Sequence, residues 1–129
     1  MDADPQLTPA ILAGFVGSVG ILALPAEGQI AWLQGLPVKV GAIELALSFE
    51  DEYLQMPLFL AAGWLSPQAE ATATTVDRLL DEMSADPEPP WTFDEVRTDP
   101  RWAAVRDAAF ALLCAITGSS PRTEPPARA

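Results

Sequence analysis

The feature that most constrains the fold is a repeated helix-start signal, in which a hydroxyl or carboxylate residue is followed directly by proline. Three of these pairs stand directly before a stretch with helical apolar spacing: Thr8-Pro9, Ser66-Pro67 and Asp99-Pro100. A Thr, Ser or Asp side chain at the N-cap accepts a backbone N–H, and proline fits the first helical position because no donor is needed there. The three pairs therefore predict helices that begin near residues 9, 67 and 100.

The helix from Pro9 is expected to be short. Gly17 and Ser18 interrupt its apolar residues, and a glycine inside a helix costs about 1 kcal/mol relative to alanine. We therefore expect the helix to end there. The apolar residues 19–24 allow either a short buried strand or the tail of the same helix, because periodicity does not separate the two in so short a run.

Residues 25–34 also allow two structures. Pro25 at the first position and Gly35 as the C-terminal cap predict a helix. Alternatively, the turn-forming residues after Pro25 would join two strands in a small hairpin over 19–34. We favour the helix because Gly35 followed by Pro37 is a helix-stop signal.

The central stretch from Ile43 to Pro67 joins the densest apolar run to an uninterrupted acidic triplet, Glu50-Asp51-Glu52. Some of its apolar residues alternate as in a strand. Others recur every three to four residues, and the abundant Ala, Glu and Leu favour a helix from about Gly41 to Met56. Pro57 removes a backbone donor and is expected to kink or restart that helix.

Three further helices are expected in the second half of the chain. The Ser66-Pro67 helix runs to about Ser84, and the proline-rich residues 85–90 form a loop. Thr92 to Glu95 is a capping box that opens a short helix. The last helix runs from Pro100 to Thr117, where Gly118 ends it.

These signals predict an all-α protein, a single compact orthogonal helical bundle of about five to six helices. The alternative is an α+β fold with the hairpin at 19–34. A length of 129 residues corresponds to one domain. Within it we expect a flexible N-terminus over 1–6, a single helical domain over 7–118 and a disordered proline-rich tail over 119–129.

The charge is strongly negative and unevenly distributed. The formal net charge is −11, and between residues 41 and 96 a single base, Arg78, stands against twelve carboxylates. Such a negative field repels nucleic acid and anionic lipid, so neither is expected as a partner. It favours either a basic protein partner or a role of the charge in solubility alone.

No membrane association is expected, with residues 10–24 as the one segment that could insert. That run is apolar, but glycines dilute it and no Lys or Arg flanks it. The acidic start of the chain lacks the basic front of a secretory signal. A single cysteine, Cys114, makes no intramolecular disulfide, so a cytoplasmic location is expected. We expect the protein to be a monomer or a homodimer.

Several classes of chemistry are excluded by composition. The chain has no histidine, which removes serine triads, cysteine–histidine pairs and histidine-ligated zinc. One cysteine is too few for an iron–sulfur cluster or a thiolate zinc site. We therefore predict no catalytic residue, no metal site and no cofactor. Asp77 and Asp81, one helical turn apart, leave oxygen ligation of Mg²⁺ or Ca²⁺ as an alternative.

The predicted function is a non-enzymatic, acidic protein-interaction domain that binds a basic protein, similar in profile to an immunity or antitoxin protein. An exposed Tyr or Trp among carboxylates is typical of an interface anchor. The candidate partner-binding residues are Glu50, Asp51, Glu52, Tyr53, Asp77, Asp81, Glu82 and Trp91. Two alternatives remain open. One is an adaptor or structural subunit that self-assembles through the glycine-rich N-terminal segment; the other is an enzyme that uses carboxylates and a divalent metal.

Overall fold

The computed structural model describes residues 8–118, and all regular structure within that range is helical. The helices are α1 (Pro9–Ala23), α2 (Ala26–Gln34), α3 (Ile43–Tyr53), α4 (Met56–Ala61), α5 (Pro67–Ser84), α6 (Phe93–Thr98) and α7 (Pro100–Thr117). The all-α prediction is confirmed. The alternative hairpin over 19–34 is wrong, because those residues form the end of α1 and the whole of α2. The segments expected to be flexible, 1–6 and 119–129, lie outside the described residues.

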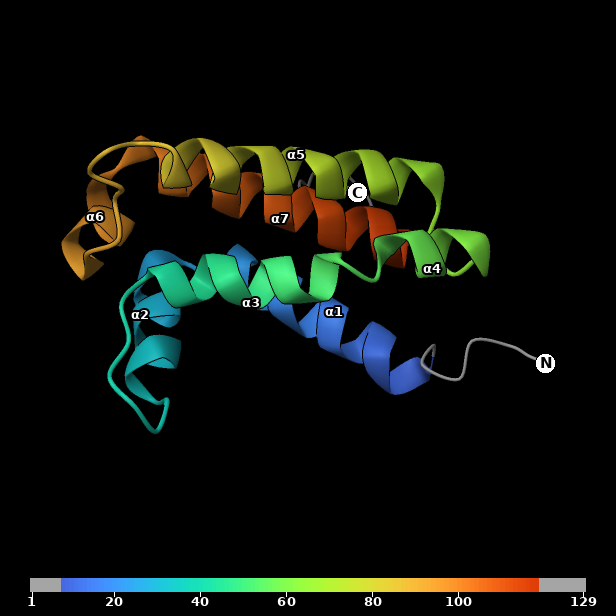
Figure 1. Cartoon of the computed structure of the whole chain (residues 1–129), viewed down its shortest axis with the longest axis horizontal. Coiled ribbons are helices and arrows are strands. Elements are labelled where there is room, and N and C mark those ends of the chain that lie inside the picture. Colours follow the sequence, from blue (N-terminus) through green and yellow to red (C-terminus); the bar gives the residue numbers. More distant parts are fainter. Residues whose placement is uncertain (1–7, 119–129) are drawn as a thin grey trace, which may run out of the picture.

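Four of the helices form a closed ring. Helix α7 packs between α5 and α1, α1 packs on α3, and α3 returns to α5. Figure 1 shows α5 and α7 side by side in one layer, with α1 and α3 in the layer beside it. Helices α2 and α6 contact each other and lie together at one end of the bundle. The core is therefore enclosed by the ring and closed at that end by the short helices.

The expected end of the first helix at Gly17-Ser18 is wrong, because α1 continues to Ala23. Phe15, Val19 and Leu22 lie on one side of α1 and are buried. Burying each such side chain contributes about 1.5–3 kcal/mol, which exceeds the cost of about 1 kcal/mol for a glycine. Tertiary packing thus overrides the local penalty and keeps α1 continuous.

Among the helices of residues 8–118, none combines the length and the hydropathy that crossing a bilayer requires.

The predicted caps are present where the sequence placed them. The Thr8 side chain accepts from the Ile11 N–H at 3.3 Å, and the Ser66 side chain accepts from the Ala69 N–H at 3.1 Å. Both bonds of the capping box at Thr92 are formed. Because these signals depend only on neighbouring residues, they fix the helix starts independently of the rest of the fold.

The helix expected from Gly41 to Met56 is divided. Helix α3 ends at Tyr53, and α4 begins at Met56 with Pro57 in its first turn. Proline in the first turn is compatible with a helix start, because it lacks a donor that the helix would not use there.

The break between α3 and α4 lets two aromatic rings reach the same core residue. The ring centroid of Phe15 lies 6.0 Å from that of Phe49 in α3 and 5.7 Å from that of Phe59 in α4.

We expect Gly17→Ala to raise the free energy of unfolding by about 0.5–1 kcal/mol, because alanine is the better helix former. An added Cβ at Gly17 meets no atom within 4 Å, so no clash opposes the gain. The measurement is urea denaturation followed by far-ultraviolet circular dichroism.

Gly118→Ala is the matched control, because Gly118 ends α7 with a φ of 80°. A side chain in that conformation is strained, so this variant should lose about 1–2 kcal/mol. A loss of stability in Gly17→Ala would contradict a continuous α1.

Candidate functional site

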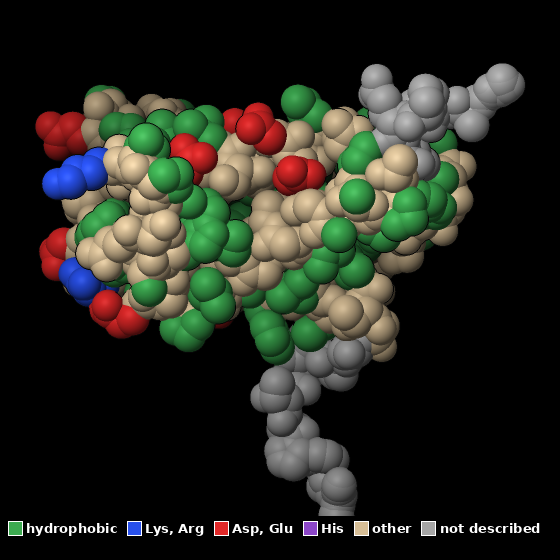
Figure 2. All heavy atoms as spheres, turned by 90° about the horizontal axis from the view of Figure 1, so that it is seen from below, with side chains coloured by type: hydrophobic (Ala, Val, Ile, Leu, Met, Phe, Trp, Pro, Cys, Tyr) green, Lys and Arg blue, Asp and Glu red, His purple; other side chains and the backbone are tan. Residues whose placement is uncertain are grey.

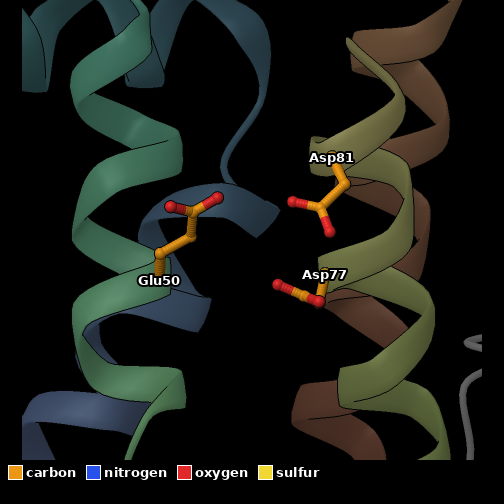
Figure 3. A group of neighbouring side chains, drawn as sticks. All are labelled: Glu50, Asp77 and Asp81. Atoms are coloured by element: carbon orange, nitrogen blue, oxygen red, sulfur yellow. The ribbon is translucent and has the colours of Figure 1, made fainter. Parts of the chain in front are cut away.

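Three carboxylates converge between α3 and α5. Glu50 of α3 points toward Asp77 and Asp81 of α5, as Figure 3 shows. One carboxylate oxygen from each of the three residues lies within 4.8 Å of the others. We call these three residues the carboxylate cluster. The sequence predicted Asp77 and Asp81 on one helix face, and the tertiary fold adds Glu50.

The packing of α3 on α5 dictates this arrangement. Phe49 precedes Glu50 and is fully buried, as are Val76 and Leu80, which precede the two aspartates. Each carboxylate therefore stands one position beyond a core residue, at the edge of the helix–helix interface. Glu50 and Asp77 are half-buried in consequence, whereas Asp81 is exposed.

The surroundings disfavour the charged forms of two cluster members. Partial burial raises the pKa of Glu50, and the negative charges of Asp81, Asp77 and Asp51 raise it further. Burial also raises the pKa of Asp77, and the negative charge of Asp81 raises it further. Like charges held together and partly withdrawn from water favour either protonation or an incoming cation.

No base in residues 8–118 forms an ion pair with the carboxylate cluster. Arg78, the nearest base in sequence, pairs instead with Glu82 at 2.9 Å along α5. Figure 2 views the bundle from below the orientation of Figure 1 and shows basic side chains at the end where α2 and α6 lie. The rest of that face carries hydrophobic and acidic side chains.

The acidic triplet fans out as expected for consecutive residues on a helix. Glu50 faces α5, and Asp51 is exposed to solvent. Glu52 turns toward α1, where a Cβ built on Gly14 would lie 3.0 Å from its Oε1 atom. Cβ atoms added to the other glycines in α1, Gly17 and Gly20, would meet nothing within 4 Å. Only one residue of the triplet therefore joins the cluster.

The two predicted aromatic anchors are partly built into the fold. Tyr53 stacks on Phe49 at 5.5 Å between ring centroids, and its hydroxyl hydrogen-bonds to Thr74 Oγ1 at 3.2 Å. It therefore links α3 to α5 beside the cluster.

Trp91 is half-buried and packs edge-on against Trp102, with ring centroids 6.0 Å apart. Its carbonyl accepts from the N–H of Ala42 at 3.0 Å, so it lies at the start of α3. Ala42 is eight residues from Glu50, which corresponds to roughly 12 Å along a helix. Trp91 is therefore not part of the carboxylate cluster.

A second polar centre was not anticipated from the sequence. Gln29 of α2 is fully buried, and its Nε2 atom donates to the carbonyl of Leu22 at 2.8 Å. Its Oε1 atom accepts from Nη1 of Arg106 in α7 at 3.1 Å. The only signal in the sequence is that Arg106 directly follows Val105 on the apolar stripe of α7.

Comparison of the chain with protein-family models, with curated proteins and with solved structures gave no significant match.

We expect Glu50→Gln to raise the free energy of unfolding at pH 7 by about 0.5 kcal/mol, because it removes the repulsion between Glu50 and the two aspartates of α5. This magnitude is that of a like-charge pair one turn apart on a helix. The pKa of Glu50 is raised in the folded state, so the folded protein takes up this proton more readily than the unfolded chain. The wild type should therefore recover stability relative to the variant as the pH falls from 7 to about 5.

Urea denaturation at several pH values measures this difference. Glu88→Gln, at an exposed loop position away from the cluster, is the matched control and should show no such dependence. A difference between Glu50→Gln and the wild type that grows as the pH falls would contradict the interpretation.

Proposed function

We propose that the protein is a non-enzymatic interaction domain that binds a basic protein partner through the surface formed by Glu50, Asp51, Asp77 and Asp81. We call this surface the acidic face. The observation that carries the proposal is the convergence of three carboxylates without a neutralising base in residues 8–118.

A guanidinium or ammonium group from a partner would remove the repulsion within the cluster. A planar guanidinium can donate to two carboxylates at once, and hydrogen bonds to charged groups contribute about 1.5–3 kcal/mol each. The surplus of carboxylates around the cluster would also attract a basic partner over longer distances and increase its association rate.

The proposal assigns no bond-making chemistry to the protein. The chain has no histidine, and its single cysteine, Cys114, is buried within α7. In the most specific form suggested by size and charge, the partner is a cationic toxin, and the protein acts as an immunity or antitoxin protein in the cytoplasm.

A divalent cation is the second candidate for the same cluster. Mg²⁺ and Ca²⁺ bind carboxylate oxygens, and three oxygens within 4.8 Å of one another are close enough to share such an ion. This candidate is separated from the first by the experiment below.

The test is affinity capture from a lysate of the source cells with the tagged full chain, followed by mass spectrometry. The cluster variant carries Glu50→Gln, Asp77→Asn and Asp81→Asn. The control variant makes the same charge change at three exposed positions, Glu88→Gln, Asp94→Asn and Asp107→Asn. We expect one basic protein to be retained by the wild type and the control, and its recovery to fall about tenfold or more with the cluster variant.

Salt provides a second readout, because screening of exposed charges should weaken retention between about 0.1 and 0.5 M NaCl. Equal recovery with the cluster and control variants would overturn the proposal. A rise in melting temperature with Ca²⁺ or Mg²⁺ that the cluster variant loses, without a basic partner, would assign the cluster to a metal instead.

A further inference from the structure

A groove lies between the corner that joins α1 to α2 and the middle of α7. Leu24 and Pro25 line it from the corner, and Phe110 and Ala111 line it from α7 together with Arg106. Its volume is about 550 Å³, within the range of small-molecule sites. The aromatic ring of Phe110 contributes an exposed apolar wall, with 41% of the residue accessible to solvent. We call this feature the Arg106 groove.

Arg106 differs from the other arginines of residues 8–118. Arg78, Arg97 and Arg101 each pair with a carboxylate. Arg106 donates only to neutral acceptors, from its Nη1 atom to Gln29 Oε1 at 3.1 Å and to the Val96 carbonyl at 3.0 Å. Its Nη2 and Nε atoms have no hydrogen-bond partner in the described part of the chain.

The charge of this guanidinium is held in place but not compensated by contact with an acid. The residue is half-buried, and burial lowers the pKa of Arg106 while leaving it protonated at neutral pH. Asp107 also lines the groove and acts on Arg106 at a distance, without an ion pair. A positive group fixed by neutral partners and with donors to spare is suited to binding an anion.

The adjoining helix end adds to the same preference. Pro25 is the N-cap of α2 and provides no side-chain acceptor for the first amides of that helix. The N-terminal end of a helix carries a partial positive charge and unpaired N–H groups. The one carboxylate in the first turn, Glu27, is engaged by Arg97 at 2.6 Å.

We propose that the Arg106 groove binds a small amphipathic carboxylate, with the carboxylate on the Arg106 guanidinium and an aliphatic tail along Leu24 and Phe110. The guanidinium supplies two parallel donors for a carboxylate. The apolar walls favour a ligand with an aliphatic tail over a purely ionic one. This site is independent of the acidic face, which lies on α3 and α5.

The test uses sodium octanoate as the probe, titrated into the full-length ¹⁵N-labelled chain at constant ionic strength and followed by two-dimensional NMR. Octanol has a similar tail without the charge, and acetate has the charge without the tail. We expect saturable shifts centred on the groove, with octanoate bound about tenfold or more tightly than either comparison compound.

Arg106→Gln should weaken octanoate binding about 10- to 100-fold, as expected for the loss of a charge-assisted pair of hydrogen bonds. Arg78→Gln, which removes an exposed arginine on α5, is the matched control and should leave the affinity unchanged.

Two further variants, at Asp107 and Phe110, test the site even if Arg106→Gln disturbs folding. Neither residue takes part in the hydrogen bond between Arg106 and Gln29. Asp107→Asn removes the competing carboxylate and should tighten octanoate binding about two- to fivefold. Phe110→Ala removes the apolar wall and should weaken it about fivefold.

Octanol binding as tightly as octanoate, or an unchanged octanoate affinity in Asp107→Asn, would overturn the assignment of the carboxylate to Arg106. Displacement of octanoate by inorganic phosphate with an unchanged affinity in Phe110→Ala would overturn the amphipathic ligand in favour of a simple anion.

Discussion

One buried amide side chain, that of Gln29, connects α2 to the last turn of α1 and, through Arg106, to α7 and α6. Gln29 belongs to α2, and its Nε2 atom donates to the carbonyls of Leu22 and Ile21 in the last turn of α1 at 2.8 and 3.4 Å. Its Oε1 atom accepts from Arg106 of α7, which also donates to the Val96 carbonyl of α6. Each of these groups would cost about 1–3 kcal/mol if it were buried without a partner, so alternative packings of the corner are disfavoured.

The parts of the fold that could be predicted from sequence are those governed by near neighbours. The capping box at Thr92 and the N-cap at Ser66 require only residues within one turn, and both form as expected. The end of α1 could not be predicted in this way. The local cost of Gly17 is real, but Val19 and Leu22 are buried against other helices, and their contribution is invisible to any rule of local propensity.

The candidate site likewise has a part that could be predicted from the sequence and a part that could not. Helical spacing alone places Asp77 and Asp81 on one face, and it also separates Glu50 from Glu52 by a large angle around α3. That Glu50 meets the two aspartates follows only from the packing of α3 on α5. The Gln29–Arg106 contact joins residues 77 positions apart in the chain, and no spacing rule connects them.

The carboxylate cluster and Arg106 are both charged sites that no group of opposite charge contacts in residues 8–118. In a chain with a net charge of −11, a base has many acids to choose from, and three described arginines do pair with them. Yet the carboxylate cluster around Glu50 has no base in residues 8–118, and Arg106 makes its hydrogen bonds to neutral oxygens. The ring of helices holds each uncompensated group in place, because α3 is anchored by α1 and α7 by both α1 and α5. The fold thus tolerates uncompensated charge of opposite sign at two separate places, and this is the common basis of the two binding proposals.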